Sequence, residues 1–599
     1  MRNRFKALVV LLALATPAVM MPVVGVASQA PTIMPLNEIR PGMHGVGKTV
    51  IYGQRVEEFQ FEVIDIMQSG GGPVGTDKLI LFRMYGPLVE KTGGTAAGMS
   101  GSPMYINGRL IGALSAAFSW QAPKRDIALA TPIEEMLKVL ERRRPSGQRP
   151  RIYHASRTLT IGGRFVDRVM VAPTPEMARR LETAGRAGIA VAVPAVATFA
   201  RGLSPRAARI LAGLIQPMGH EILQGHGGRG DFTAAPIVPG SSVGIQQIRG
   251  DIDFGGICTV TARIGNRVLV CGHPWDNLGD VEYILTASEI LTVLRALPRP
   301  FKVGNLGEMI GLIDQDRGGA IAGSLGPLPR LFNLRVIVTD MDTGSRVQLG
   351  AQMIRRRDMA RMLAPLAALS ATERARNQGG GEGTATVKLT LRAKGLPAAI
   401  VRENMFYSTR DVAVASVLDI VDAMELAFYN DLRKLDPYDL TVETSLTRRR
   451  VTASIVEAEA AFREVSPGST LLVRVVLQPY QAESRVIRII EVPIPRDFPR
   501  GPAVIAVRSA GMDSARVPVE VQLGQALGAE PEPWGVDSLE NALRFFESFG
   551  RNTDILVRVL PYGLPATQAE FTRFDVPAAR FIRTDWVIQG SERIPILIR

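Results

Sequence analysis

The sequence predicts a mainly β protein that is divided into several domains. Its 599 residues are about four times the ~150 residues of a typical domain. Glycine and proline are numerous, with 59 and 40 residues, and they separate many short runs rich in valine and isoleucine. Hydrophobic residues make up 46% and charged residues 21% of the chain, which is ordinary globular usage and excludes a disordered or coiled-coil protein.

The N-terminus has the pattern of a secretory signal peptide over residues 1–27. Three basic residues precede an apolar run over residues 7–26 that ends in small side chains suited to signal peptidase. An uncleaved membrane anchor is the alternative, but Pro17 and Pro22 interrupt the run. We therefore expect export to the periplasm or the extracellular space, with no stable membrane span after cleavage.

The formal charge of the chain is +13, from 70 basic and 57 acidic residues. Only 10 of the basic residues are lysines, and the 60 arginines are scattered along the chain. They form no basic arm with interleaved aromatic residues, which a nucleic-acid-binding surface would need. We expect no nucleic-acid partner.

Residues 31–375 are predicted to form the first domain. Short β-rich runs separated by glycine turns occupy residues 45–116, as in a barrel or a sandwich. A helix is expected over residues 132–140, and a helical insertion with two amphipathic helices is expected over about 155–235. The second of these helices begins at Ser204, which can cap it, and the proline that follows suits a first helical turn.

The rest of the chain alternates between strand-rich and helix-containing regions. Strands resume at residue 242 and are interrupted by a predicted helix over 283–297. A glycine-rich run then begins a linker and helix-containing connector over residues 376–450. Short strands with proline and glycine turns predict a β-sandwich module over 451–525, and a small α/β segment is expected over 526–599.

The chain contains two cysteines, Cys258 and Cys271, which excludes a disulfide scaffold and a multi-cysteine zinc site. They flank a tight turn at Gly265 and Asn266, so the segment is interpreted as a hairpin whose cysteines can face each other. A disulfide in an oxidising compartment and two buried thiols are both compatible with this pattern.

No metal or cofactor site is expected. His44, His154, His220 and His226 lack the short paired spacing of zinc ligands and are interpreted as turn or surface residues. The glycine-rich stretch at residues 225–231 lacks the ending and the strand–helix context of a phosphate-binding loop.

The segment Gly98-Met99-Ser100-Gly101-Ser102-Pro103 carries the strongest chemical signal. Glycines on both sides of a serine allow the backbone to turn tightly enough to aim its own N–H groups at one point. The amides of Gly98 and Ser100 would then form an oxyanion hole, with the Ser100 hydroxyl beside it as a nucleophile. A plain glycine–serine turn is the structural alternative.

Five blocks of the chain carry a resemblance to a known family. Residues 57–63, 91–113, 131–137, 256–274 and 307–326 together resemble the SpoIVB serine peptidases of bacterial sporulation and their exported relatives. The blocks extend over roughly residues 35–340, and the segment around Ser100 is the most specific of them.

The resemblance implies a serine endopeptidase with a chymotrypsin-like core of two β-barrels. Within it, Ser100 matches the nucleophile and His273 the general base. The serine block precedes the histidine block, the reverse of the order in the sporulation protein, and we recognise no PDZ module. Because catalytic triads are defined by geometry, this order does not exclude activity.

The third catalytic position has no obvious counterpart in this sequence. Asp77, Glu90, Asp276 and Asp280 are candidate acids, with Asp276 and Asp77 the first two, and a backbone carbonyl is a further alternative.

The sequence thus predicts an exported serine endopeptidase that acts on a peptide or protein substrate through an acyl-enzyme on Ser100. The alternative is a catalytically silent envelope protein that keeps the barrel as a binding or assembly scaffold. The sequence makes no prediction of the oligomeric state.

Overall fold

The computed structural model describes residues 31–599, except 70–76, 119–124, 142–150, 162, 173–174, 184–187, 195–196, 219, 221, 223–229, 296–299, 512–522, 524–526, 528–537, 549 and 563–577. The predicted signal peptide (residues 1–27) lies outside the described residues. The protein is mainly β, as expected, and its sheets are strongly curled. No helix in the described part of the chain is long and apolar enough to cross a membrane.

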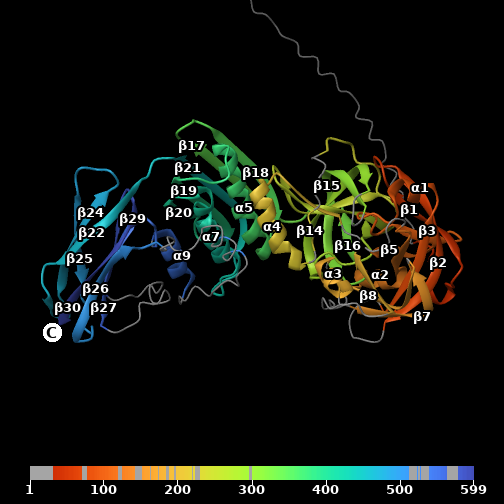
Figure 1. The fold of residues 1–599 in the computed structure, drawn as a ribbon, viewed down its shortest axis with the longest axis horizontal. Helices are drawn as coiled ribbons and strands as arrows, with labels where there is room; N and C mark the ends of the chain where they lie inside the picture. Colours follow the sequence, from red (N-terminus) through yellow and green to blue (C-terminus); the bar gives the residue numbers. More distant parts are fainter. Residues whose placement is uncertain are drawn as a thin grey trace, which may run out of the picture.

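Six antiparallel strands close into a first barrel, drawn red and orange in Figure 1. Their order around the barrel is β1-β2-β3-β6-β5-β4, and β4 pairs back onto β1. On β2, Phe59, Phe61 and Val63 point into the barrel and polar residues alternate with them. The elements are β1 (His44–Val50), β2 (Val56–Ser69), β3 (Lys78–Tyr85), α1 (Pro87–Thr92), β4 (Pro103–Ile106), β5 (Arg109–Phe118), β6 (Ile127–Pro132) and α2 (Ile133–Leu140), preceded by the short turn η1 (Leu36–Glu38).

A second six-stranded barrel repeats the strand order of the first. Its ring runs β11-β12-β13-β16-β15-β14 and returns to β11. The strands are β11 (Ser242–Gly250), β12 (Asp253–Ile264), β13 (Arg267–Val270), β14 (Gly279–Leu294), β15 (Phe301–Arg317) and β16 (Ala320–Leu325).

The helix expected over residues 283–297 is wrong, because most of this segment belongs to strand β14. From Tyr283 to Ser288 every residue of β14 is buried, so both faces of the strand are covered. Such a strand loses the apolar–polar alternation by which strands are recognised, and its continuous apolar run cannot be told from a helix by periodicity.

The segment between the barrels is mixed and is not the helical insertion that was expected over residues 155–235. Both predicted helices are present, and the Ser204 hydroxyl caps the second by accepting the N–H of Ala207 at 3.2 Å. Strands accompany them because β2 and β5 extend beyond their barrel neighbours β1 and β4, and the extended ends pair with β7 and β9. Strand β10 pairs with β12 of the second barrel. The elements are β7 (Arg151–Ile161), β8 (Arg164–Val171), α3 (Pro175–Thr183), β9 (Gly188–Pro194), β10 (Ala197–Arg201), α4 (Pro205–Ile215) and η2 (Gln216–Met218).

Residues 376–450 do not form the linker and connector that were expected. The sheet of the second barrel continues through β11-β18-β17-β21-β19-β20, and β21 pairs in parallel with β17 across the glycine-rich run. The glycines make a short turn between a helix and the next strand. The strands are β17 (Leu331–Asp340), β18 (Arg346–Ile354), β19 (Gly383–Lys394), β20 (Ile400–Ser408) and β21 (Asp436–Thr447).

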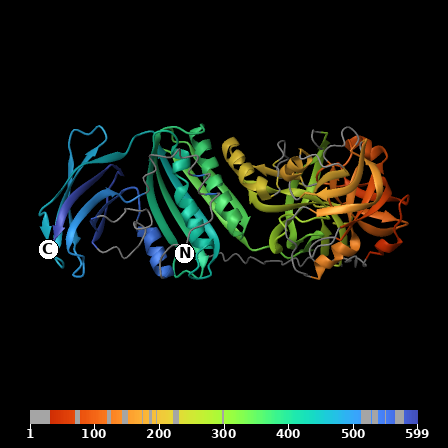
Figure 2. The same ribbon diagram turned by 60° about the horizontal axis from the view of Figure 1, so that its bottom comes forward.

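Helices pack on this extended sheet, as Figure 2 shows for the green and cyan part of the chain. Their apolar residues form one cluster with the inner faces of β17 to β21. Because α5 packs against α4 and α7 as well as β17 and β18, it is buried on almost every side. The helices are α5 (Arg357–Arg376), α6 (Val412–Ala415) and α7 (Leu418–Phe428).

The C-terminal region is one β-sandwich, so the predicted boundary between residues 451–525 and 526–599 is wrong. One sheet has the order β25-β24-β22-β29 and the other β23-β30-β26-β27-β28, so strands from both predicted segments share both sheets and one core. The strands are β22 (Thr452–Ala460), β23 (Glu464–Val465), β24 (Thr470–Pro479), β25 (Val486–Pro493), β26 (Gly501–Ser509), β27 (Asp554–Pro561), β28 (Ala579–Arg583), β29 (Val587–Gln589) and β30 (Ser591–Ile598). Helix α9 (Leu539–Ser548) packs on β20.

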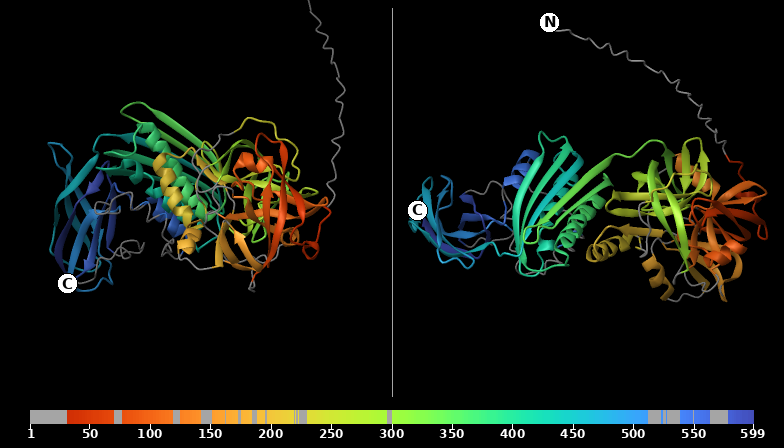
Figure 3. Two further views of the ribbon diagram at one scale, coloured as in Figure 1. Left: turned by 45° about the vertical axis from the view of Figure 1, so that its right-hand side comes forward. Right: turned by 90° about the horizontal axis from the view of Figure 1, so that it is seen from above.

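The parts follow one another along an elongated molecule. Figures 1 and 3 show the two barrels at one end, the helix-covered sheet in the middle and the sandwich with the C-terminus at the other end. The two barrels lie against each other, and the segment around Ser100 lies where they meet.

Candidate active site

Residues 93–102, here called the serine loop, connect α1 to β4. Gly98 and Gly101 have φ angles of +92° and +90°, a conformation that residues with a side chain rarely adopt. The chain therefore turns sharply on both sides of Ser100, and this local geometry requires the glycines that the sequence provides.

The amide of Gly98 belongs to a peptide unit whose orientation is set by the second barrel. The carbonyl of that unit, on Ala97, accepts a hydrogen bond of 2.9 Å from the N–H of Lys302. In a trans peptide the N–H points opposite to the C=O, so the Gly98 N–H points away from Lys302. This N–H donates to no acceptor among the residues that the structure describes.

The orientation of the Ser100 amide is also set by hydrogen bonds to the carbonyl of its peptide unit. The carbonyl of its peptide unit, on Met99, accepts the N–H of Ser102 at 2.9 Å and the Ser102 hydroxyl at 2.6 Å. The Ser100 N–H therefore points away from Ser102. A preorganised oxyanion hole requires donors of fixed orientation, and these contacts fix the peptide units of both amides.

Thr259 on β12 holds the serine loop from the second barrel. Its N–H donates to the Ser100 carbonyl at 2.8 Å, and its hydroxyl donates to the Gly98 carbonyl at 3.1 Å. Both bonds cross from one barrel to the other.

Gly101 lies at the closest approach of the two barrels. The hydroxyl of Thr261 donates to its carbonyl at 2.7 Å. A Cβ atom at this position would lie 2.0 Å from the Thr259 carbonyl oxygen and 2.5 Å from the Cys271 nitrogen. Only glycine fits between these backbones.

Residues 271–278, here called the histidine turn, follow β13 and carry His273. At the start of the turn, the Gly272 carbonyl accepts the hydroxyl of Thr131 from the first barrel at 2.6 Å. His273 is 4% exposed, and its Nδ1 lies 2.7 Å from the Pro274 carbonyl oxygen. Because a carbonyl only accepts, Nδ1 carries the proton in this bond, and Nε2 is the basic atom of the neutral ring.

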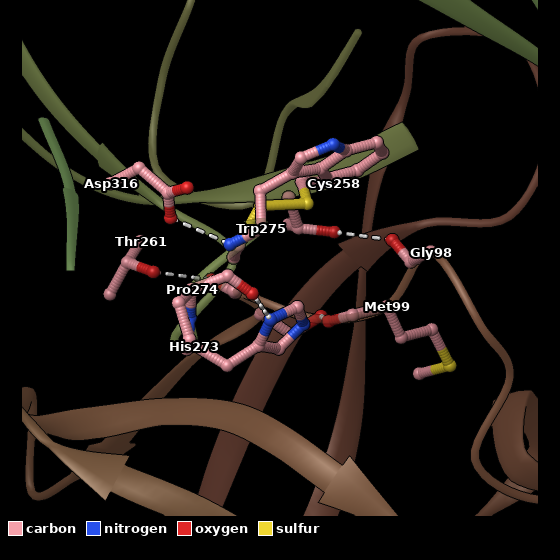
Figure 4. The surroundings of a disulfide bond; sticks show 12 residues. Gly98, Met99, Cys258, Thr261, His273, Pro274, Trp275 and Asp316 are labelled. Carbon is pink, nitrogen blue, oxygen red and sulfur yellow. Dashed lines mark hydrogen bonds between the residues drawn. A yellow bond between two sulfur atoms is a disulfide. The ribbon is translucent and has the colours of Figure 1, made fainter. Parts of the chain in front are cut away.

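The two cysteines are joined in the structure, with an S–S distance of 1.98 Å. The bond attaches the first residue of the histidine turn to β12, next to Thr259. Figure 4 shows that Gly98, Met99 and His273 all belong to the surroundings of this disulfide.

Asp316 on β15 supports the histidine turn, although no motif in the sequence marks this residue. Its carboxylate accepts the N–H groups of Trp275 and Asp276, each at 2.7 Å, and the first of these bonds is drawn in Figure 4. Burial raises the pKa of Asp316 to about 6, with the nearby charge of Asp276 adding to the effect.

Asp276, the first candidate for orienting His273, is engaged with four other side chains. Its carboxylate accepts hydrogen bonds from His220 Nε2 at 2.8 Å, Tyr283 Oη at 2.8 Å, Gln247 Nε2 at 3.1 Å and the guanidinium of Arg356. Burial raises its pKa, but the charge of Arg356 and the bond from His220 outweigh burial and hold the pKa below its usual value.

His220 is not the turn or surface residue that was expected. It is 4% exposed, its Nδ1 lies 3.3 Å from the Thr198 hydroxyl, and its ring centroid is 5.0 Å from that of Trp275. Its partner Asp276 is 56 positions away in the chain, so no short spacing could reveal the pair.

The other candidate acids are exposed, whereas Ser100 and His273 are buried. The loop contacts β3 near its C-terminal end, where the Thr95 hydroxyl lies 3.2 Å from Met84 Sδ. Asp77 is exposed at the opposite end of β3, roughly 20 Å away at ~3.3 Å per residue. Glu90 is exposed on α1, and Asp280, with 80% of its side chain exposed, pairs with an arginine.

Within the described ranges no group of three or more histidine, cysteine, aspartate and glutamate side chains could hold a metal ion. His226 lies outside the described residues.

A protein-family model described as SpoIVB peptidase S55 matches residues 25–137. This match confirms the resemblance to the SpoIVB-type family over the first barrel and the serine loop, and it supports a serine peptidase as the class of protein. The blocks at residues 256–274 and 307–326 lie outside the matched range. No curated protein matches the chain, and no solved structure matches it.

Proposed function

We propose that the protein is an exported serine endopeptidase whose site lies between two chymotrypsin-like barrels, with Ser100 as nucleophile and His273 as general base. One observation carries the proposal. Thr259 donates its N–H to the Ser100 carbonyl at 2.8 Å, and its own carbonyl accepts the N–H of Cys271, two residues before His273, at 3.3 Å. A single residue thus bonds both to Ser100 and to the histidine turn.

The proposed reaction assigns one role each to the Ser100 hydroxyl, to His273 and to the amides of the serine loop. The Ser100 hydroxyl attacks the substrate carbonyl while His273 Nε2 takes its proton. The amides of Gly98 and Ser100 donate to the oxyanion of the tetrahedral intermediate. His273 then gives the proton to the leaving amine, and water hydrolyses the acyl-enzyme by the same steps in reverse.

The Pro274 carbonyl takes the orienting position in this proposal. It holds the imidazole in the tautomer that leaves Nε2 basic, as the acid of a triad does. A neutral carbonyl stabilises the imidazolium less than a carboxylate, so we expect slower turnover than in a full triad.

The second candidate is a catalytically silent envelope scaffold, with the C-terminal sandwich as its adhesive part. The complete burial of Ser100, at 0% exposure, favours this alternative because a substrate must reach the hydroxyl.

A fluorophosphonate probe distinguishes the two candidates, because it labels only an activated serine. We expect the mature protein to be labelled and Ser100→Ala and His273→Ala to be unlabelled, with all three folded by circular dichroism. Ser115→Ala is the matched control, since Ser115 is also buried but bonds to the Leu129 carbonyl within the first barrel. A folded mature protein without labelling or peptide turnover would favour the scaffold.

A further inference from the structure

Lys302, the second residue of β15, is a buried lysine between the two barrels. Only 2% of it is exposed. Its ammonium donates to the Thr49 hydroxyl of the first barrel at 3.0 Å and to the Thr259 hydroxyl of the second at 3.3 Å.

The same residue restrains Gly98 and its peptide units in three ways. Its backbone N–H directs the Ala97–Gly98 peptide, as described above. Its side-chain carbons lie 3.1 to 3.2 Å from the position that a Cβ on Gly98 would take. Its ammonium bonds to the hydroxyl of Thr259, which in turn donates to the Gly98 carbonyl at 3.1 Å.

The ammonium gives the bonds through Thr259 a fixed direction. A lysine ammonium has donors and no acceptor, so the Thr259 oxygen must accept from it. The single hydroxyl hydrogen of Thr259 is then left for the Gly98 carbonyl. Lys302 therefore leaves the hydroxyl hydrogen of Thr259 for the bond that holds this carbonyl.

Burial of this ammonium is unfavourable for the fold. Removal from water lowers the pKa of Lys302 to about 7, and no acidic group contributes to that shift. An apolar side chain of similar length would fill the same space without the loss of hydration. Packing alone therefore does not explain a lysine at this position.

We propose that Lys302 is a positioning residue of the oxyanion hole. Acting through Thr259 on the Gly98 carbonyl, it fixes the Gly98–Met99 peptide unit, which lies between the two donor amides of Gly98 and Ser100. This inference rests on the proposed serine peptidase function and adds a residue to it. Hydrogen bonds hold the carbonyls of four successive residues, Ala97, Gly98, Met99 and Ser100. Lys302 itself donates to the Ala97 carbonyl, and through Thr259 it supports the bond to the Gly98 carbonyl.

The test measures the rate constant with which the fluorophosphonate probe labels Ser100. We expect Lys302→Met to lower it by about 10- to 1000-fold, since losing one oxyanion donor costs about 100- to 1000-fold, while the melting temperature stays unchanged or rises. Lys48→Met is the matched control. Lys48 pairs with Glu58 on the partly exposed side of β1, and the labelling rate should not change.

Two variants of Thr259 test whether Lys302 acts through the Thr259 hydroxyl. Their results do not require Lys302→Met to fold. Thr259→Val removes the hydroxyl and should slow labelling as Lys302→Met does, whereas Thr259→Ser keeps the hydroxyl and should restore most of the rate. The double variant Lys302→Met/Thr259→Val should be no slower than Thr259→Val alone, because both act on one hydrogen bond.

Wild-type labelling rates in folded Lys302→Met, or equal rates in Thr259→Val and Thr259→Ser, would overturn the inference while leaving the proposed function intact. An unlabelled wild-type protein would instead overturn the proposed function itself.

Discussion

Replacing Gly101 with alanine tests whether the two barrels meet as closely as the structure places them. Alanine at a φ of +90° costs roughly 1–2 kcal/mol from backbone strain alone. Its Cβ would also lie 2.0 Å from the Thr259 oxygen and 2.5 Å from the Cys271 nitrogen, so these backbones must separate by an ångström or more.

That separation disrupts hydrogen bonds on both sides of the contact. The Gly101 N–H donates to Leu114 at 2.7 Å, its carbonyl accepts from Thr261 at 2.7 Å, and the Cys271 N–H donates to Thr259 at 3.3 Å. At about 1 kcal/mol each, their loss brings the expected destabilisation to about 4–5 kcal/mol.

Gly108→Ala provides the matched control. Gly108 has a φ of +74°, but no atom lies within 4 Å of an added Cβ, so only the strain of roughly 1–2 kcal/mol applies. Urea unfolding of both variants measures the difference directly. Equal destabilisation of the two variants would show that the barrels do not approach each other at Gly101.

Three further predictions concern buried groups. The pKa of Lys302 is about 7 in the folded protein and 10.5 ordinarily, so between these pH values the unfolded chain binds more protons than the folded one. The free energy of unfolding of wild type, relative to that of Lys302→Met, should therefore rise between pH 7 and pH 10.5 by up to about 5 kcal/mol. Urea unfolding of both proteins at pH 7 and pH 10 measures this change. Asp276→Ala should destabilise the protein by about 3–5 kcal/mol in thermal or urea unfolding, because it removes one of the two carboxylates that pair with the buried guanidinium of Arg356 and also the buried acceptor of Tyr283 and Gln247; a change below 1 kcal/mol would contradict this buried cluster. Thiol counting on denatured, unreduced protein should find no free thiol, since Cys258 and Cys271 form a disulfide that stabilises by about 3 kcal/mol at most, and two reactive thiols would refute the bond.

The sequence was most informative where the signal is local. The two glycines around Ser100, the cap at Ser204 and the alternating strand β2 each act within a few residues, so their geometry follows from residue type and spacing. The resemblance to the SpoIVB-type family depends on the same short segment around Ser100, and the family match includes it.

Predictions failed where burial hides the pattern. Strand β14 is covered on both faces, so its continuous apolar run wrongly predicts a helix. The glycine-rich run after α5 predicts a linker, although β21, which follows it, pairs with β17, which precedes it. The periodicity of apolar residues along a segment shows which face of a helix or strand is buried. It does not show whether another element covers the opposite face.

The sequence by itself determined the mainly β class, the tight turn around Ser100 and the family resemblance, because these depend on neighbouring residues. Only the tertiary structure decided which groups surround that turn. Thr259, Lys302 and Asp316 are distant in sequence from the groups they hold, and hydrogen bonds of this kind, within a barrel or between barrels, form only when the strands have paired. Such contacts depend on the pairing of whole strands, and no local spacing records that pairing.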